Sequence, residues 1–289
     1  MSLLRRRTIE AKTPDQIRIM RRAGLVVAQT LDLARTAATA GVTTADLDAA
    51  AEESIRSSGA TPSFKGYHGF PASLCISVND EVVHGIPGSR VLADGDLVSI
   101  DCGAIVDGWH GDAAITVIVG GDDCAAARAA DAAVLHDTER AMWAGIAALR
   151  PGHRLYDVGQ AIESSITTAS SRRRGDGHDV RYGIVEDYVG HGIGTSMHMD
   201  PHVPNYAVQG KGPSVPVGAT LAIEPMVTLG TIETTTLDDD WTVITTDGSR
   251  AAHWEHTVAV TSGGLWVLTA LDGGRDGLGL AGAAYGPLG

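Results

Sequence analysis

The chain reads L-V-S-I-D-C-G-A-I-V-D-G-W-H-G-D-A-A-I from Leu97 to Ile115. The two apolar runs predict buried strands, and the link V-D-G-W at residues 106–109 indicates a hairpin turn between them. Each strand contains one aspartate, Asp101 in the first and Asp112 in the second. Because a buried lone carboxylate is costly unless it is paired or coordinates a metal, this stretch predicts a sheet that presents acidic side chains to one cavity.

Three further candidate ligands lie in the second half of the chain. His191 lies in the glycine-flanked turn V-G-H-G-I-G, Glu224 in L-A-I-E-P-M and Glu255 in H-W-E-H-T-V-A-V. Taken singly, each candidate has an ordinary alternative: the aspartates could cap turns, the histidine could be a loop residue, and the glutamates could lie on edge strands or be half exposed. Their joint occurrence in apolar segments favours a common partner, and a cluster of divalent cations satisfies all five.

Composition limits the classes of function. Hydrophobic residues make up 44% of the 289 residues and charged residues 20%, which is typical of a soluble globular enzyme. The net charge of −13 argues against broad binding to nucleic acid or anionic membranes. No apolar run approaches the ~18 residues of a membrane span, and the N-terminus lacks an apolar signal core, so we expect a cytoplasmic protein. Without a C-x-x-C pair, reduced thiols are expected at the three cysteines, Cys75, Cys102 and Cys124.

The order of predicted elements is two helices, a group of strands, two more helices and a second group of strands. A capping box, Thr13-Pro14-Asp15-Gln16, opens the first helix. We expect a polar loop at residues 170–180 and a mobile glycine-rich tail at the C-terminus. This order predicts an α+β fold of two similar halves with the metal site between them. The helices are expected at 13–41, 44–59, 123–149 and 154–169, and the strands within 61–119 and 181–268.

The donor set indicates the kind of metal. Four carboxylates and one imidazole form an oxygen-rich site, which suits Mn, Fe(II), Co or Mg better than a structural zinc. Two cations held ~3.5–4 Å apart can share a water, lower its pKa and stabilise a tetrahedral intermediate. The site therefore predicts metal-assisted hydrolysis.

Six segments resemble those of the type I methionine aminopeptidases, metallopeptidases with the pita-bread fold. They occur in the family's order and at close to its spacings, from about Thr13 to Leu268. The resemblance implies an N-terminal arm at 1–12, a single catalytic domain at 13–270 with halves at about 13–120 and 121–270, and a flexible glycine-rich tail at 271–289. The segments are G-Y-H-G-F-P-A-S-L-C-I-S-V-N-D-E-V-V-H-G-I-P, D-G-D-L-V-S-I-D-C-G, D-G-W-H-G-D, V-G-H-G-I-G, A-I-E-P-M and W-E-H-T-V-A-V-T.

The same resemblance implies a role for each ligand. It implies two divalent ions, with Co, Mn or Fe(II) expected first and Zn or Mg as further options. By this similarity Asp112 and Glu255 bridge both ions. Asp101 holds one ion, and His191 and Glu224 hold the other. Glu224 is also a candidate general base, and the sequence leaves open whether it acts as base, ligand or both.

Two further histidines and an apolar pocket follow from the match. His84 matches the residue that contacts the scissile amide nitrogen, and His198 matches the one that stabilises the carbonyl oxygen of the intermediate. Imidazole suits both tasks near neutral pH. The family often has tyrosine near Phe70 and phenylalanine near Met197, so these two positions bear on selectivity. With His84 and His198, the expected substrate-binding residues are Tyr67, Phe70, Cys75, Met197 and Trp241, whose ordinary alternative is core packing.

The predicted activity is hydrolytic removal of the initiator methionine from proteins and peptides with a small second residue. The expected partners are nascent polypeptide N-termini, at the ribosome, with no nucleic acid or membrane, and the chain is expected to be a monomer. An Xaa-Pro aminopeptidase or prolidase of the same fold is the first alternative, although those enzymes usually carry a sizeable N-terminal domain. A non-catalytic pita-bread binding protein is the second, although such proteins typically lose ligands that this chain retains.

Overall fold

The computed structural model describes residues 9–175 and 181–289. The capping box that opens the first helix is formed as predicted. The Thr13 backbone N–H donates to Oε1 of Gln16 at 2.8 Å, and the Gln16 N–H donates to the Thr13 hydroxyl at 3.3 Å. None of the described helices is long and apolar enough to cross a membrane. The helices are α1 (Pro14–Ala37), α2 (Thr44–Ser57), α3 (Gly121–Ala127), α4 (Ala129–Ala148), α5 (Asp157–Gly175) and α6 (Arg275–Leu280), with a 3-10 turn, η1, at Tyr67–Gly69.

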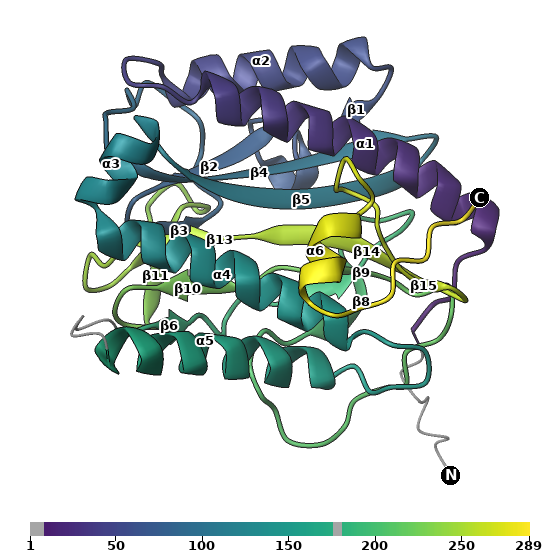
Figure 1. The fold of residues 1–289 in the computed structure, drawn as a ribbon. Helices are drawn as coiled ribbons and strands as arrows, with labels where there is room; N and C mark the ends of the chain where they lie inside the picture. Colours follow the sequence, from purple (N-terminus) through teal and green to yellow (C-terminus); the bar gives the residue numbers. More distant parts are fainter. Residues whose placement is uncertain (1–8, 176–180) are drawn as a thin grey trace.

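Antiparallel strands form one large curved sheet and two small ones (Figure 1). The large sheet has the strand order β1-β4-β5-β14-β9-β7-β8, with β2 added on β4 and β15 on β14. Its strands are β1 (Thr61–Pro62), β2 (Leu74–Val78), β4 (Leu97–Val106), β5 (Trp109–Ile118), β7 (Gly190–Gly192), β8 (Met199–Val203), β9 (Thr220–Ile223), β14 (Glu255–Thr261) and β15 (Gly264–Val267). The small sheets consist of β3 (Glu81–Val83), β11 (Thr234–Thr236) and β12 (Val243–Thr245), and of β6 (Gly183–Ile184), β10 (Met226–Thr228) and β13 (Ala251–His253).

Strands β4 and β5 form the predicted hairpin. Their register pairs Val106 with Trp109, so only two residues make the turn. Both turn residues have positive φ, 49° at Asp107 and 78° at Gly108, which matches the right-handed twist of the flanking strands. An Asp-Gly pair tolerates this conformation better than most residues, and the turn therefore fixes the register of the hairpin.

The register places the acidic residues of the first half on one face of the sheet. Ala114 pairs with Asp101 on one side and with Glu255 on the other. Residues opposite one another on neighbouring strands share a face, and so do residues two apart along a strand. Asp112, two residues before Ala114, therefore joins Asp101 and Glu255 on that face.

The second half adds its ligands to the same face. Ala222 pairs with His191 on one side and with Thr257 on the other. Thr257 lies two residues after Glu255, and Glu224 lies two residues after Ala222 at the end of β9. Pairing and alternation together thus direct all five predicted ligands to one side of a continuous sheet.

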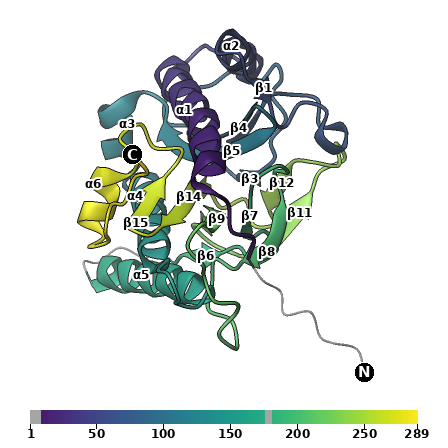
Figure 2. The ribbon, with the colours of Figure 1, turned by 90° about the vertical axis from the view of Figure 1, so that its right-hand side faces the viewer.

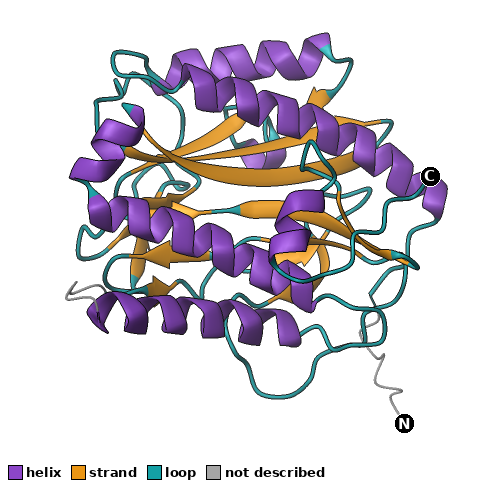
Figure 3. Cartoon of the chain, in the orientation of Figure 1, coloured by secondary structure: helices purple, strands orange, loops and turns teal. Residues whose placement is uncertain are grey.

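The opposite face of the sheet packs against helices in two separate cores. Ile100 of β4 lies in a core with Val27 of α1, and Val258 of β14 lies in a core with Met142 of α4. Figure 2 shows α1, α4 and α6 on one side of the strands and β3, β11 and β12 on the other. The elements follow the predicted α+β order along the chain. Figure 3 shows helices above and below the strands, and the two halves meet where β5 pairs with β14.

The prediction of a loop at residues 170–180 is wrong for residues 170–175. Helix α5 continues to Gly175, because Arg172 and Arg173 reach the carboxylate of Asp137 on α4. The Asp137 side chain is fully buried and also accepts a hydrogen bond from the Tyr182 hydroxyl at 2.8 Å. Residues 176–180 lie outside the described residues.

The single helix expected at 123–149 is divided at Arg128, which ends α3 and precedes α4.

The tail, predicted to be flexible, packs on the body of the protein. Leu278 of α6 is fully buried, and a side chain at Gly277 would overlap the ring of Trp143. Further along, Tyr285 pairs with Leu265 of edge strand β15. The tail is ordered by these contacts with residues far away in sequence.

Residues 1–8 of the predicted N-terminal arm lie outside the described residues. The end of the arm is packed, because Lys12 is buried and its backbone N–H donates to the Gly218 carbonyl at 2.8 Å.

Candidate metal centre and substrate pocket

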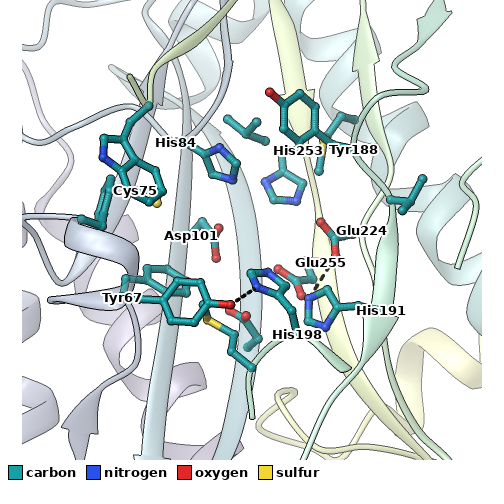
Figure 4. Close-up of a pocket in the computed structure, with 18 residues that line it drawn as sticks. Tyr67, Cys75, His84, Asp101, Tyr188, His191, His198, Glu224, His253 and Glu255 are labelled. Atoms are coloured by element: carbon teal, nitrogen blue, oxygen red, sulfur yellow. Dashed lines mark hydrogen bonds and ion pairs between the residues drawn. The ribbon is translucent and has the colours of Figure 1, made fainter. Parts of the chain in front are cut away.

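A cavity of about 270 Å³ lies on the face of the sheet away from the helices (Figure 4). All five predicted ligands and all seven predicted substrate-binding residues line it. The ligands are Asp101, Asp112, His191, Glu224 and Glu255, and the substrate-binding residues are Tyr67, Phe70, Cys75, His84, Met197, His198 and Trp241. The structure brings these residues together, while their chemical roles stay predictions.

Several carboxylate oxygens in the cavity lack a hydrogen-bond partner. Oδ1 of Asp101, Oδ1 of Asp112 and Oε1 of Glu255 are buried and accept no hydrogen bond from the described residues. Oε1 of Glu224 accepts none either, and lies 3.3 Å from Nε2 of His191. Ligand atoms of Asp112, His191 and Glu255 all lie within 4.8 Å of one another. Unsatisfied buried carboxylates at this spacing fit divalent cations.

The electrostatics of the cavity also favour cations. Burial raises the pKa of Asp101 to about 7. Burial, followed by the negative charge of Glu255, raises the pKa of Asp112 well above its ordinary value, and the pKa values of Glu224 and Glu255 are raised in the same way. The cluster therefore resists ionisation when it is alone, and bound cations would stabilise its ionised form.

His191 presents a free lone pair to the carboxylates. Its Nδ1 lies 2.9 Å from the Gly192 carbonyl, which can only accept, so Nδ1 carries the proton. Burial lowers the pKa of His191 to about 3, which keeps the ring neutral. Nε2 is thus unprotonated and faces Glu224, the arrangement that a metal-binding imidazole requires.

Glycines around the site permit close backbone approaches. A Cβ at Gly190 would lie 2.4 Å from the Ala222 carbonyl oxygen, and one at Gly192 would lie 2.4 Å from that of Asp200. These contacts explain why His191 is flanked by glycine on both sides. His84 has a φ of 61°, and the glycine that follows it, Gly85, lies against the Ile76 carbonyl.

One end of the cavity is apolar. Phe70, Cys75 and Met197 belong to a buried cluster, and Trp241 packs against it with its ring 5.1 Å from that of Phe70. Aromatic rings and sulfur atoms make favourable contacts with a thioether. This end therefore offers a compartment for a linear apolar side chain beside the acidic cluster.

Two histidines lie between the apolar end and the acidic cluster. His84 packs between the rings of Tyr188, at 5.4 Å, and Trp241, at 6.3 Å. Burial lowers its pKa to about 4, so the ring is neutral. The ring of His198 lies 4.5 Å from that of His191, and its Nδ1 is 2.8 Å from the Tyr67 hydroxyl.

The sequence analysis missed part of the lining. His253 is fully buried, its Nε2 has no partner among the described residues, and burial lowers its pKa to about 3. Its position two residues before Glu255 was no reliable signal, because β13 ends at His253 and β14 begins at Glu255 in a different sheet. Tyr188, three residues before His191, carried no such signal because that segment is not a regular strand. The remaining members are Phe64, Val83, Val189 and Met226.

Known proteins match this chain over most of its length. The sequence model of metallopeptidase family M24 matches residues 18–262. A methionine aminopeptidase 1 from Mycobacterium tuberculosis is 55% identical over 265 residues, which cover 91% of this chain and 96% of that protein. The crystal structure of a methionine aminopeptidase from Thermotoga maritima superposes with a TM-score of 0.83 at 38% identity, covering 91% of this chain and all of that one. Fold and site define a pita-bread metallopeptidase. The chain belongs to metallopeptidase family M24, and within it to the bacterial methionine aminopeptidases.

A prolidase from Pyrococcus horikoshii is a more distant structural neighbour. Its TM-score is 0.65 at 19% identity, and the match covers 91% of this chain but 63% of the prolidase. This likeness shows the shared fold alone.

Proposed function

We propose that this chain removes the N-terminal methionine from peptides whose second residue is small, by hydrolysis assisted by two divalent cations. The observation that carries the proposal is the meeting of two features in one cavity of about 270 Å³. One is a buried set of unsatisfied carboxylates, and the other is an apolar compartment rich in sulfur and aromatic rings. An exopeptidase for methionine needs both side by side.

The cations would be held by residues from both halves. Asp101, Asp112, His191, Glu224 and Glu255 would hold them, since all five line the cavity and ligand atoms of Asp112, His191 and Glu255 lie within 4.8 Å of one another. The oxygen-rich set suits Co, Mn or Fe(II), with Zn or Mg as further options. When bound, the pair supplies Lewis acidity and lowers the pKa of water at the site.

The apolar end orients the substrate. The methionine side chain would pack against Phe70 and Trp241, with its sulfur near Cys75 and Met197. Its free amino group would then lie toward the acidic cluster, which favours a positive charge. This position limits cleavage to the first peptide bond and leaves room for a small second residue.

Three residues would accept a proton from, or form hydrogen bonds with, the reacting groups. Glu224, whose pKa is raised by burial, would accept the proton of the attacking water as well as serve as a ligand. His198 would donate a hydrogen bond to the carbonyl oxygen as charge develops there. His84, held neutral by burial, would hydrogen-bond the nitrogen of the scissile amide, where the leaving amine forms.

We also place the substrates and the setting by inference. The substrates would be N-termini of nascent polypeptides, met at the ribosome in the cytoplasm by a monomeric enzyme. The net charge of −13 supports peptide substrates over nucleic acid.

Peptide cleavage tests the proposal directly. The metal-depleted enzyme should be inactive, and added Mn²⁺ or Co²⁺ should restore cleavage of Met-Ala-Ser but not of Ala-Pro-Ala. Faster cleavage of Ala-Pro-Ala would favour the Xaa-Pro alternative. Failure to cleave either peptide with any of the five metals would favour a non-catalytic binding protein.

A further inference from the structure

The Tyr67 hydroxyl contacts His198 across the two halves of the molecule. Its oxygen lies 2.8 Å from Nδ1 of His198, and Figure 4 shows the His198 ring between Tyr67 and the acidic cluster. We propose that Tyr67 is a positioning residue, whose hydroxyl donates to Nδ1 and thereby fixes His198 in the tautomer that carries its hydrogen on Nε2. This inference rests on the proposed function, in which His198 must donate to the substrate carbonyl.

The tautomer decides whether His198 can act. A neutral imidazole has one ring nitrogen that donates and one that accepts. With the hydrogen on Nδ1, Nε2 would present a lone pair to the carbonyl oxygen, which also carries lone pairs, and the contact would be repulsive. With the hydrogen on Nε2, the ring donates as charge develops. The partner of Nδ1 therefore selects the competent form, as it commonly does for histidine.

Tyr67 is suited to be the donor of this hydrogen bond. The ordinary pKa of a tyrosine hydroxyl is about 10, so Tyr67 keeps its proton near neutral pH. Nδ1 of His198 is the one partner of this hydroxyl that the described part of the chain shows. Donation to Nδ1 gives that proton an acceptor within the protein, 2.8 Å away.

The Tyr67 backbone is held in a closed turn. The N–H of Tyr67 donates to the Phe64 carbonyl at 2.8 Å, and the N–H of Phe70 donates to the Tyr67 carbonyl at 2.9 Å. The N–H of Gly66 donates back to the Phe70 carbonyl at 2.8 Å. A tyrosine on such a turn presents its hydroxyl at a set place.

His198, in contrast, has little else to hold its ring. It is an exposed residue between two strands, although its neighbour Met197 is only 3% exposed. Across residues 9–175 and 181–289, Tyr67 is the one hydrogen-bond partner of the His198 ring. Removal of the hydroxyl should therefore free the ring without unfolding the turn.

Kinetics with a double-mutant cycle distinguishes positioning from pocket lining. Tyr67→Phe keeps the ring and should lower kcat about tenfold with KM changed less than about twofold, while His198→Ala should lower kcat about 100-fold. Because Tyr67 acts through His198, the double variant should match His198→Ala. Additive losses, or an unchanged kcat in Tyr67→Phe, would overturn the proposal. Tyr206→Phe removes a hydroxyl at a tyrosine outside the cavity, and it should leave kcat unchanged.

Imidazole nitrogen NMR reads the tautomer without relying on activity. In the Zn²⁺-loaded enzyme, the His198 signals, assigned by their loss in His198→Ala, should show a protonated Nε2 and a bare Nδ1. In Tyr67→Phe they should show exchange between two tautomers. A protonated Nδ1 in the unsubstituted enzyme would refute the inference. This result is independent of the proposed function, which fails instead if the unsubstituted enzyme does not cleave Met-Ala-Ser.

Discussion

Asp112 lies at the centre of the acidic cluster, 4% exposed, with one oxygen unsatisfied. Asp112→Asn keeps the shape of the side chain but removes a negative charge from the proposed metal site, so cleavage of Met-Ala-Ser should vanish and metal content should fall well below two ions per chain. The metal-free variant should also melt at a higher temperature than the metal-free parent, because it lacks a buried carboxyl that must take up a proton when the chain folds. Elemental analysis and thermal melting measure both effects.

A surface carboxylate provides the matched control. Asp32→Asn makes the same chemical change on the exposed side of α1, where the Asp32 carboxylate pairs with Arg35. It should leave metal content and cleavage intact. Near-normal cleavage by Asp112→Asn would exclude the dinuclear site.

Trp241 tests the assignment of the apolar end. Its ring packs against Phe70 at 5.1 Å and lies half-buried in the wall of the cavity. An apolar pocket should separate methionine from leucine by roughly 1–3 kcal/mol in kcat/KM. Trp241→Ala widens the compartment and should reduce that difference, measured with Met-Ala-Ser and Leu-Ala-Ser. A preserved difference would place the methionine side chain elsewhere.

At the scale of single residues, the sequence analysis identified the site residues that stand out within a local motif. Asp101 and Asp112 stand out because they interrupt apolar strands joined by a short turn. His253 did not stand out, because its place depends on the pairing of β13 with β10, where it lies opposite Met226. The hydrogen bond between Tyr67 and His198 joins residues 131 positions apart, and no local pattern could have indicated it.

Among the elements, the C-terminal tail should contribute to stability rather than to cleavage. Leu278 of α6 is fully buried, whereas Leu280, two residues on, is 92% exposed. Leu278→Ala should lower the free energy of unfolding by about 2–5 kcal/mol, and Leu280→Ala should change it by less than about 0.5 kcal/mol. Urea unfolding measures both. Equal effects would show that α6 is not packed in solution.

The elements predicted well are those with signals of their own. The capping box at Thr13 opens α1, and Asp107 and Gly108 turn the hairpin. The errors share a different cause. The end of α5 depends on the buried Asp137, 35 and 36 residues before the arginines that pair with it, and the tail depends on partners such as Arg18, which donates to the Gly289 carbonyl. A polar or glycine-rich composition cannot indicate contacts that arise only after the chain has folded.

For the whole molecule, metal removal should change how stability depends on pH. Burial raises the pKa of Asp101 to about 7, whereas an unfolded aspartate has a pKa of about 3.9. The folded metal-free protein thus binds more protons than the unfolded chain in this range, and its stability should fall as the pH rises. Buried histidines such as His253, with a pKa of about 3, act in the opposite sense below about pH 6.5. Burial raises the pKa values of Asp112, Glu224 and Glu255 well above their ordinary values, which extends the decline beyond pH 7, so we expect it between about pH 6.5 and 8.

Bound metal should reverse that trend. Cations bind the deprotonated carboxylates, so occupancy, and with it the melting temperature at a fixed Mn²⁺ concentration, should rise over the same pH range. Thermal melts with and without Mn²⁺ test the pair of expectations. A metal-free protein that gains stability from about pH 6.5 to 8 would contradict the buried, protonated state of the cluster.

The seam between β5 and β14 joins the two halves through only two registered pairs, Ala114 with Glu255 and Ala113 with His256. Most of each large apolar core comes from one half, and the chain passes between the halves at Gly120 and Gly121, both exposed. Two polypeptides divided at that point would each carry an incomplete set of ligands, 1–120 with Asp101 and Asp112 and 121–289 with the other three. Cleavage of a methionyl peptide by the mixture would then require the two fragments to associate. The rate of cleavage would therefore report how much of the two fragments is bound to each other.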